Sequence, residues 1–548
     1  MSQALEQKQR ITVQLQMPLF DSFETTIEKS ETSIDLTQPT FDQYTFQDYI
    51  NEINKRGLEP VWPAILEYCI NGGSNSLLQV DNFAMLYEAG LAELDKENKK
   101  SSGQYFTPND VASLMARWLK ELDGENVCDV GCGTGNLILA YLREVDSSKV
   151  IALLKNKRIY LYDNDETALK IARYSIAIKY GKQYLDSINI ICGDFLDSSI
   201  SLPNNSKVIS NPPYFKITSI CPNWALTENL MSSKDFYSAI MEKCIISNSK
   251  LVIITPYSFI GGNKFFALRQ VMNNHSGFIV SFDNVPGNIF NGKKHGIFNS
   301  NTANSVRAAI TVVDNKSNKK GFRTSHLIRF RTAERKKLLS NGYLEDLAST
   351  EYYLVDTNSP AYPKCHKELQ GVFNTWRNKS SQTLKELLAP YPNEHALYIP
   401  NTCRYFTTAS SVKLNRVGMI KIHAQDLASY DFLYCLINSS FAYWHWRIYD
   451  GGITYTCGLL ESMPVFIGLL SREDKNFFRQ MREQMSQVEN KYIIKKLNAG
   501  KVQENIKFPS TYRKKINERL FNILGCADSH KLLDLVHSNA VFVNHEED

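Results

Sequence analysis

Between residues 101 and 315 short β-rich runs alternate with helical stretches, and this alternation restricts the fold more than any other feature of the chain. The β-rich runs cover residues 126–130, 158–162, 188–192, 208–210, 251–255 and 308–313. Such alternation is typical of a parallel sheet with helices on both faces, because a helix returns the chain to start the next parallel strand. The pattern therefore predicts a doubly wound α/β sheet.

The segments on either side differ in composition. Residues 1–40 are rich in Gln, Ser, Thr and Glu and show little apolar periodicity, which predicts a flexible arm. Over residues 41–100 apolar residues recur at spacings of three and four, which predicts a helical cap. A polar, basic stretch at 315–321 ends the alternation, and residues 316–548 mix helical and β-rich patterns with many aromatic and Arg residues. We expect a doubly wound domain over 101–315 and a mixed α+β domain over 316–548.

Composition excludes several classes of protein. No apolar run in the 548 residues approaches the roughly 20 that span a membrane, and the polar N-terminus has no apolar core of a secretory signal. We therefore expect a cytoplasmic protein without a membrane partner. The eleven cysteines form no CxxC pair and no zinc-type spacing, so we expect neither a disulfide framework nor a metal. The net charge of +5 does not identify a partner by itself.

A glycine-rich turn follows the first β-rich run. Residues 127–136 read Val-Cys-Asp-Val-Gly-Cys-Gly-Thr-Gly-Asn, so Asp129 precedes Gly131, Gly133 and Gly135. Glycines let the backbone approach a ligand closely at the carboxyl edge of a parallel sheet, where doubly wound folds bind cofactors. The leading acid suits a cationic methionyl group better than a pyrophosphate. A glycine turn that serves tight packing alone is the alternative reading of this segment.

Acidic residues also follow the next two β-rich runs. Asp163 ends the run Tyr160-Leu161-Tyr162, where an acid accepts both hydroxyls of a ribose. Asp194 and Phe195 follow the next run, where the acid suits an adenine amino group and the ring suits stacking. The spacing makes the three strand ends support one another as one cofactor site.

The most specific signal is Asn211-Pro212-Pro213-Tyr214, directly after the fourth β-rich run. A conjugated amino group is a poor nucleophile because its lone pair is delocalised. The side-chain oxygen of Asn211 and the carbonyl of Pro212 can accept its two hydrogens, which favours tetrahedral nitrogen with the lone pair aimed at a methyl group. The prolines stiffen this backbone, and Tyr214 offers a face on which a planar target stacks. The segment therefore predicts methylation of an amino group.

In their order along the chain, these segments resemble the gamma group of amino-methylating DNA methyltransferases, the N6-adenine enzymes of restriction-modification systems. The segments that carry the resemblance are Gly103 to Pro108, Asp129 to Asn136, Asp163, Asp194-Phe195 and Asn211 to Tyr214. The resemblance implies a Rossmann-like class I methyltransferase core over 101–315, a DNA target-recognition domain over 316–548 and S-adenosyl-L-methionine as cofactor. It also implies cofactor contacts for Tyr105, Phe106, Thr107, Pro108, Asp129, Gly131, Gly133, Gly135, Asn136, Asp163, Asp194, Phe195 and Asn211, and a catalytic role for Asn211, Pro212, Pro213 and Tyr214.

A later segment resembles the part of this family whose aromatic residue covers the second face of an extruded base. The segment is Asn284 to Phe290, followed after an insert by Ser305 to Ile310, and it makes Phe290 the candidate for the second face. Extruding a base costs a few kcal/mol and each base-to-aromatic stack returns about 1–3 kcal/mol, so Tyr214 and Phe290 together could offset it.

The choice of polymer depends on the rest of the chain. The same turn also serves enzymes that methylate cytosine N4, RNA or protein glutamine, and these remain alternatives. A DNA enzyme needs a domain that reads sequence, which residues 316–548 could provide. Basic segments at 323–337, 491–501 and 513–519 are interleaved with apolar residues, as phosphate-contacting surfaces are. Ordinary solvated helix faces are the alternative.

Three further hypotheses concern other activities. Cytosine C5 chemistry is disfavoured because no Pro-Cys dipeptide occurs, and no convincing nuclease pattern is present, so we expect any cognate restriction endonuclease to be encoded separately. A binding protein that has lost activity is disfavoured because Asp129, Asp194, Asn211 and Tyr214 are intact. In the arm, Gln16 to Phe20 resembles the short peptide that docks on a replicative sliding clamp, although packing on the protein's own cap is the favoured reading.

Overall fold

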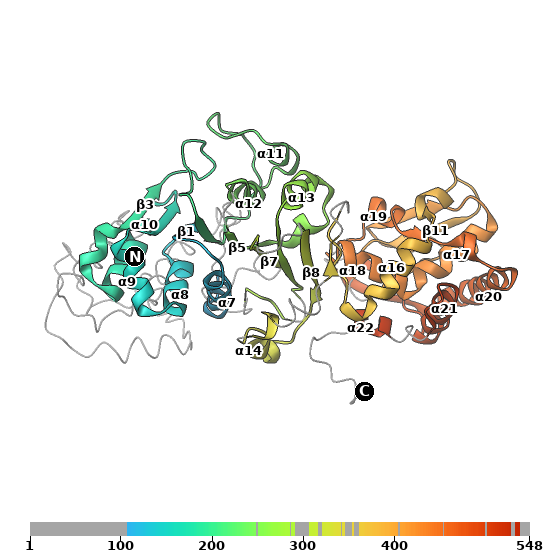
Figure 1. Ribbon diagram of the computed structural model, residues 1–548. Coiled ribbons are helices and arrows are strands. Elements are labelled where there is room, and N and C mark those ends of the chain that lie inside the picture. The colour runs from blue at the N-terminus through green and yellow to red at the C-terminus, as the bar shows by residue number, and fades with distance from the viewer. Residues whose placement is uncertain are drawn as a thin grey trace, which may run out of the picture. The chain divides into compact units, whose positions relative to one another are not determined.

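The computed structural model describes most of the chain from Thr107 onward (Figure 1). The described residues are 107–247, 250–284, 287–290, 306–315, 321–340, 342–345, 353–355, 361–403, 406–452, 454–498, 501–527 and 532–537. The predicted arm, the predicted cap and the segment Gln16 to Phe20 therefore lie outside the described residues, and the clamp hypothesis stays a prediction.

The chain divides into two compact units. The first consists of Met1–Thr255, Phe290–Val306 and Val312–Asp314, and the second of Pro256–Ile289, Arg307–Thr311 and Asn315–Asp548. The chain thus passes between the units more than once. The predicted domain boundary after residue 315 stays a prediction.

The first unit contains a parallel sheet. Its strands are β1 (Asn126–Val130), β2 (Ile159–Asp163), β3 (Ile188–Cys192), β4 (Ser206–Ser210) and β5 (Lys250–Pro256), in the order β3-β2-β1-β4-β5. All neighbouring pairs among these five are parallel. Every residue of β1 and β4 is buried, as strands of a parallel sheet covered on both faces are. The predicted α/β, Rossmann-like fold is confirmed by this arrangement.

Helices follow the strands in alternation. They are α7 (Asn109–Lys120), α8 (Asn136–Glu144), α9 (Ser147–Lys155), α10 (Glu166–Tyr180), α11 (Glu228–Ser233) and α12 (Phe236–Ile246). The strand order reverses between β1 and β4, and ligands of doubly wound sheets bind outside the carboxyl ends of the strands at such a point. The site is therefore expected beside the ends of β1 and β4.

The second unit combines strands with a larger set of helices. The strands β6 (Ser276–Phe282), β8 (Gly321–Ile328) and β9 (Tyr353–Leu354) belong to it, whereas β7 (Ala308–Val313) passes from this unit to the first after Thr311. The strand order is β7-β6-β8-β9, with β6 and β8 parallel. Three short antiparallel pairs join β10 (Gln382–Thr383) to β13 (Pro464–Val465), β11 (Ala396–Pro400) to β12 (Met419–His423), and β14 (Ile493–Asn498) to β15 (Lys501–Ile506). The predicted mixed α+β character of the C-terminal region is confirmed.

The helices of this unit enclose an aromatic core. They are α13 (Phe266–Met272), α14 (Arg335–Leu338), α16 (Gln370–Lys379), α17 (Leu427–Asn438), α18 (Ser440–Tyr449), α19 (Cys457–Glu461), α20 (Arg472–Val488), α21 (Ser510–Ile523) and α22 (Asp534–His537). Trp376 of α16 stacks on Trp444 of α18 at 5.5 Å between ring centroids.

Short 3₁₀ helices occur in both units. They cover Lys182–Ser187, Tyr257–Ile260, Asn263–Phe265, Thr332–Glu334, Lys367–Leu369, Leu384–Leu387, Ile467–Leu469 and Glu489–Tyr492.

A buried ionic network stabilises the second unit beside β6. Asp283, which is 3% exposed, pairs with Arg307, Arg329 and Arg447 at 2.9 Å each. Burial alone would raise the pKa of Asp283, but the three guanidinium groups lower it to about 2. Arg335 is also buried and donates to the carbonyl oxygens of Asn288 and Ile289. The prediction that segment 323–337 follows phosphates is therefore wrong for Arg329 and Arg335, whose charges serve internal contacts.

Among the described helices, none combines the length and the apolar character that crossing a membrane requires.

Candidate active site

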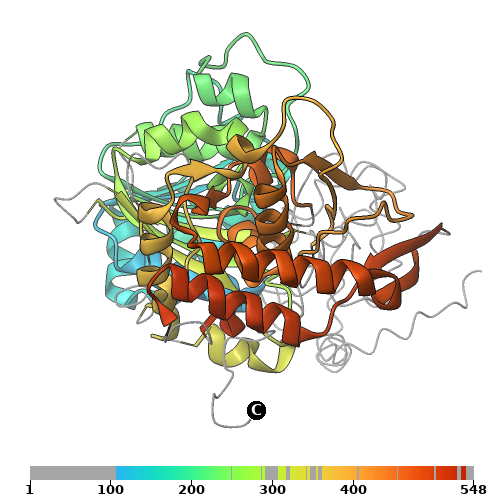
Figure 2. The ribbon, with the colours of Figure 1, turned by 90° about the vertical axis from the view of Figure 1, so that its right-hand side faces the viewer.

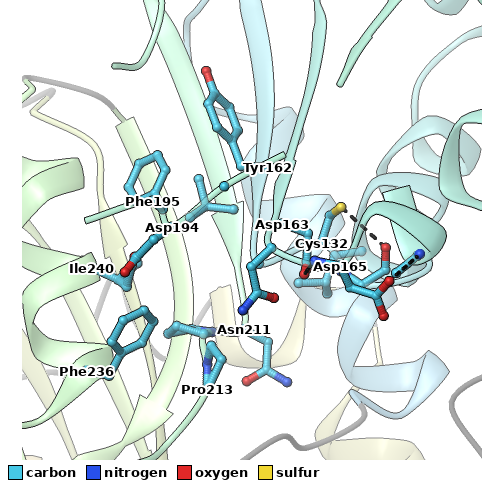
Figure 3. Close-up of a pocket in the computed structure, with 18 of the residues that line it drawn as sticks. Cys132, Tyr162, Asp163, Asp165, Asp194, Phe195, Asn211, Pro213, Phe236 and Ile240 are labelled. Carbon is cyan, nitrogen blue, oxygen red and sulfur yellow. Dashed lines mark hydrogen bonds between the residues drawn. The ribbon is translucent and has the colours of Figure 1, made fainter. Parts of the chain in front are cut away.

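A cavity of about 360 Å³ lies at the carboxyl ends of the strands of the first unit (Figure 3). Residues that follow β1, β2, β3 and β4 line it, and so do Thr107 before α7 and Ile240 in α12. Its volume lies within the range of about 300–1,000 Å³ that small-molecule sites occupy. Three acids, Asp163, Asp165 and Asp194, line this cavity, whereas none of its described lining residues is basic. The cavity therefore favours a ligand that is cationic or rich in hydrogen-bond donors.

The glycine turn is joined to the end of β2 by hydrogen bonds. Gly133 N donates to Asp163 Oδ2 at 2.8 Å, and Asp165 N donates to Asp163 Oδ1 at 3.0 Å. Burial raises the pKa of Asp163, and these backbone donors oppose the increase. Gly131 and Gly133 line the cavity with positive φ of 68° and 50°, a conformation that glycine adopts at little cost. Asp163 thus shapes the turn as well as facing the cavity.

Gly135 has a packing role instead. It caps the N-terminus of α8 with φ of 86°, and a Cβ added there would lie 2.9 Å from the Cβ of Ala172 in α10. It is not among the described residues that line the cavity. Of the two readings of the glycine turn, tight packing applies to Gly135, which lies against Ala172 of α10.

Asp129 lies beneath the turn and is fully buried. Ile138 N donates to its Oδ2 at 3.0 Å, but no described residue donates to its Oδ1. Burial raises the pKa of Asp129 to about 8, and the N–H of Ile138 opposes this shift. Asp129 is absent from the described lining of the cavity. Its observed contact joins β1 to the first turn of α8.

Aromatic side chains surround the end of the cavity that lies near Asp194 (Figure 3). Asp194 Oδ1 accepts from Leu196 N at 3.0 Å, and Oδ2 accepts from Trp224 Nε1 at 2.8 Å. Phe195 is 5% exposed and packs edge-on against Tyr162 at 5.3 Å. The sequence interpretation missed four lining residues at this end: Phe215, Trp224, Phe236 and Ile240. Phe215 directly follows Tyr214, which was a usable signal, whereas Trp224, Phe236 and Ile240 reach the cavity through the tertiary fold alone.

The segment Asn211 to Tyr214 leaves β4 at the edge of the same cavity, which Asn211, Pro212 and Pro213 line. Asn211 Nδ2 donates to Thr107 Oγ1 at 2.8 Å. Because its amide nitrogen is held in this way, Asn211 Oδ1 is directed as an acceptor. The Tyr214 hydroxyl donates to that oxygen at 2.6 Å and also lies 3.1 Å from the carbonyl oxygen of Ile254.

Tyr214 and Phe290 are neighbours, as the sequence predicts for two walls of one base site. Their ring centroids are 6.2 Å apart, and the ring planes meet at 63°. Phe290 is 7% exposed, and neither ring is among the described residues that line the cofactor-sized cavity. The two rings meet edge to face, so a planar base between them requires at least one ring to rotate.

The predicted contacts before α7 are described in part. Asn136 Nδ2 donates to the carbonyl oxygen of Thr107 at 2.7 Å, and Pro108 is the N-cap of α7. Thr107 is therefore held by Asn136 through its backbone and by Asn211 through its hydroxyl. Tyr105 and Phe106 lie outside the described residues, so their role stays a prediction.

Comparison with known proteins places this region among methylases. Residues 78–242 match the model of the family N-6 DNA Methylase. The type II methyltransferase M.BsuBI of Bacillus subtilis is 27% identical over 197 residues, which are 32% of this chain and 38% of that protein. The methylase subunit of the type I restriction enzyme MpnII of Mycoplasma pneumoniae is 27% identical over 146 residues, 25% of this chain and 26% of that protein. The matched regions thus span well under half of each relative.

Solved structures give weaker matches. The type ISP restriction-modification enzyme LlaBIII bound to DNA has a TM-score of 0.43 at 11% identity, with 96% of this chain and 55% of that chain covered. The methyltransferase subunit of a type I restriction-modification system from Streptococcus thermophilus has a TM-score of 0.36 at 16% identity, with 55% and 64% covered. At such scores the fold assignment depends on the strand order of this chain itself.

Proposed function

We propose that this chain, whose residues 78–242 belong to the N-6 DNA Methylase family, is a site-specific DNA methyltransferase that modifies the N6 amino group of adenine in a short duplex sequence. The observation that carries the proposal is the position of Asn211-Pro212-Pro213 beside an acidic cavity at the strand ends. An acceptor pair for an amino group thereby borders a site suited to a cationic methyl donor.

The residues around the cavity fit S-adenosyl-L-methionine. Asp163 and Asp194 present carboxylates from successive strand ends, where ribose hydroxyls and an adenine amino group could donate. The aromatic end near Phe195, Phe215 and Phe236 suits a planar ring. The absence of a basic side chain from the described lining suits a sulfonium and an ammonium group. When bound, S-adenosyl-L-methionine supplies an electrophilic methyl group.

The residues of the chain would act by binding and orienting the target. Asn211 Oδ1 and the carbonyl oxygen of Pro212 accept the two hydrogens of the adenine amino group, which aims its lone pair at the methyl carbon. With the methyl donor bound, the amino nitrogen held by these two acceptors would take up the methyl group and would release a proton to solvent. Because the Thr107 hydroxyl orients the Asn211 amide, Thr107 is a positioning residue.

Base extrusion requires Tyr214 and Phe290 to rearrange. The target amino group has to replace the Tyr214 hydroxyl at Asn211 Oδ1, which frees the tyrosine ring to stack on the base. Rotation of Phe290 then covers the second face. Two stacks at about 1–3 kcal/mol each offset the few kcal/mol that extrusion costs.

Duplex DNA is the proposed polymer because the relatives named above are methylases of restriction-modification systems. We propose that residues 316–548 read the target sequence and that any cognate endonuclease is a separate protein. Methylation of cytosine N4, of RNA or of protein glutamine by the same segment is the alternative.

The test is expression of the wild type and Asn211→Ala in a methylation-deficient bacterium, with modified bases mapped across the genome. We expect N6-methyladenine at one recurring motif in the wild type. Loss of the amide acceptor should reduce methylation by about 100-fold or more, beyond any change in cofactor affinity that calorimetry measures for the same variant. Asn156→Ala is the matched control, because Asn156 is an exposed residue that ends α9.

The pattern of modification separates the alternatives. N4-methylcytosine at a recurring motif would change the proposed base but keep the mechanism. An unmodified genome beside a folded protein that binds S-adenosyl-L-methionine would point to RNA or protein glutamine as the substrate, or to a partner subunit that DNA methylation requires. Undiminished methylation by Asn211→Ala would exclude the proposed role of Asn211.

A further inference from the structure

A second cavity, of about 390 Å³, lies within the second unit and shares no described lining residue with the proposed methyl-transfer site. It is bounded by residues 406–408, by Asn438 at the end of α17, by Met485 of α20 and by residues 507–513 at the start of α21. Helices α20 and α21 lie side by side in both ribbon views (Figure 2). Arg519 of α21 also pairs with Glu473 and Asp474 of α20.

The N-terminus of α21 opens into this cavity without a side-chain cap. Its N-cap residue is Pro509, which makes no side-chain hydrogen bond, and no acidic residue lies in its first turn. The first N–H groups of a helix have no partner within the helix, and they carry the positive end of its dipole. In a helix of 14 residues this end attracts an anion. Lys507 and Ser510 line the cavity beside it.

Thr408 provides an independent indication of a ligand. It lines the cavity and is 8% exposed, yet its hydroxyl makes no hydrogen bond to a described residue. The neighbouring Thr407 differs, because its hydroxyl donates to the carbonyl oxygen of Ile437 at 2.8 Å. The Thr408 hydroxyl is therefore available to a ligand or to water in the cavity.

Arg513 also has a polar atom without a hydrogen-bond partner among the described residues. It lines the cavity from the first turns of α21, and its Nε is buried without a hydrogen-bond partner among the described residues. Asp534 is near enough to influence its charge but forms no ion pair with it. No described lining residue of this cavity is acidic. Two cations, the hydroxyls of Thr408 and Ser510 and a helix N-terminus thus border a space whose described lining carries no negative charge.

The remaining walls are aromatic. Phe406, Phe508 and Tyr512 line the cavity, and Phe508 and Tyr512 have ring centroids 6.0 Å apart. The volume exceeds what a bare phosphate needs, and aromatic rings beside cations are typical of sites for single nucleotides of a strand. We infer that this cavity binds one nucleotide, with its phosphate at the N-terminus of α21 against Thr408 and Arg513 and its sugar or base against the aromatic walls.

The nucleotide could belong to DNA or be free, and the neighbouring hairpin β14–β15 favours DNA. Lys507 N donates to the carbonyl oxygen of Tyr492, and the Tyr492 and Phe508 rings are 5.9 Å apart, so the base of the hairpin adjoins the cavity. Its strands expose Leu497 by 75% and Val502 by 51%. Lys495 of this exposed ribbon is 70% exposed and pairs with Glu504 of the other strand at 3.8 Å, a separation at which a phosphate could compete for the ammonium group. The assignment of the nucleotide to DNA rests on the proposed function. The inference that the cavity binds a nucleotide does not depend on that function.

The test compares the full-length wild type with Thr408→Val and with the double variant Thr408→Val/Arg513→Gln. Lys514→Gln is the matched control, because Lys514 is an exposed cation of the same helix that does not line the cavity. Two probes are titrated: a fluorescein-labelled DNA duplex of mixed sequence over a range of salt concentrations, and free deoxyadenosine monophosphate. Binding of S-adenosyl-L-methionine and the Tm show that each variant is folded.

We expect the double variant to bind duplex DNA more weakly at every sequence, with the slope of log affinity against log salt shallower by about 0.9 for the lost phosphate contact. Thr408→Val alone should lose less affinity for duplex DNA. If the double variant does not fold, this single variant tests the nucleotide site. Loss of nucleotide binding with unchanged DNA affinity would support the site but assign it to a free nucleotide. Unchanged binding of both probes, or an equal loss in Lys514→Gln, would overturn the inference. If the wild type binds no DNA, the proposed function fails, and the nucleotide titration still tests the site.

Discussion

Acids follow parallel strands in both units, but their surroundings differ. In the first unit Asp129, Asp163 and Asp194 accept from backbone N–H groups, with Trp224 as a further donor to Asp194, and none of them forms an ion pair with a described residue. In the second unit Asp283 is paired with three arginines. Burial has raised the pKa of Asp129 to about 8, whereas the arginines hold that of Asp283 at about 2.

The comparison separates acids whose partners are neutral donors from an acid whose partners are cations. The carboxylates that line the cavity are oriented by neutral donors, so they keep their capacity to attract a cationic ligand. Asp283 cannot attract a cationic ligand in this way, because its carboxylate is already paired with three arginines. Charge alone therefore does not identify a functional acid, whereas the identity of its partners does.

Asp283→Asn should cause the largest change. It removes the negative centre of a buried cluster and leaves three arginines unbalanced, which should lower the free energy of unfolding by about 3–5 kcal/mol at neutral pH. Urea unfolding followed by tryptophan fluorescence measures this, since Trp376, Trp444 and Trp446 lie in the second unit.

Asp186→Asn is the control, because Asp186 pairs with Arg173 at the surface with its side chain 93% exposed. Surface pairs contribute about 0–1 kcal/mol. Equal destabilisation by the two variants would remove the distinction between Asp283 and a surface ion pair.

Asp163→Ala should have the next largest effect, on cofactor affinity rather than on stability of the second unit. It removes a charged acceptor from the cavity and from Gly133 N, each contact contributing about 1.5–3 kcal/mol. We expect binding of S-adenosyl-L-methionine, measured by calorimetry, to weaken by at least about tenfold. Asp163→Asn, which keeps one acceptor, should lose less; unchanged affinity in both variants would show that Asp163 shapes the turn without contacting the cofactor.

The effect of Asp129→Asn should depend on pH. The pKa of Asp129 is about 8 in the folded chain, above the ordinary value of 3.8. Its contribution to stability is therefore present below about pH 4 and is lost as pH rises through about 8. Relative to the wild type, the variant should gain stability between about pH 5 and about pH 9. Asp283 should behave oppositely, since its contribution is present above about pH 4 and is lost as pH falls toward 2.

Unfolding curves collected across this range measure both trends. A wild type and an Asp129→Asn variant with parallel pH profiles would show that Asp129 is ionised in the folded chain.

Much of the first unit could be predicted from the chain alone. The β-rich runs at 126–130 and 188–192 coincide with β1 and β3, because short runs with β-forming residues between turn signals are typical of strands. Strand β6 was missed, since it begins Ser-Gly after a polar turn and resembles a loop at that point. Arg329 and Arg335 were assigned to a surface because a basic run does not reveal that Asp283, or a pair of carbonyl groups, lies opposite in the fold.

Some residues of the candidate site could also be predicted from the sequence, and others could not. Residues adjacent to strand ends, such as Asp163 and Asn211, follow from spacing, because parallel strands bring their carboxyl ends to one edge. The resemblance to N-6 DNA methylases, drawn from those residues, is confirmed by the family match. Trp224 was not predictable, because it approaches Asp194 from a loop after the Asn-Pro-Pro-Tyr segment and has no fixed spacing from it. The contacts of Tyr105 and Phe106, and the domain boundaries, stay predictions.

The hydrogen bond from Tyr214 to Asn211 affects which molecules can reach the acceptor oxygen of Asn211. An acceptor that already holds a strong donor at 2.6 Å offers little to water or to a solvent amine, which would compete for it without compensating stacking. A nucleobase competes better, because the tyrosine that it displaces becomes its stacking partner. Under the proposed function, the Tyr214 hydroxyl would compete with the target for Asn211 Oδ1, and a bound methyl donor would be consumed only after a base displaces Tyr214.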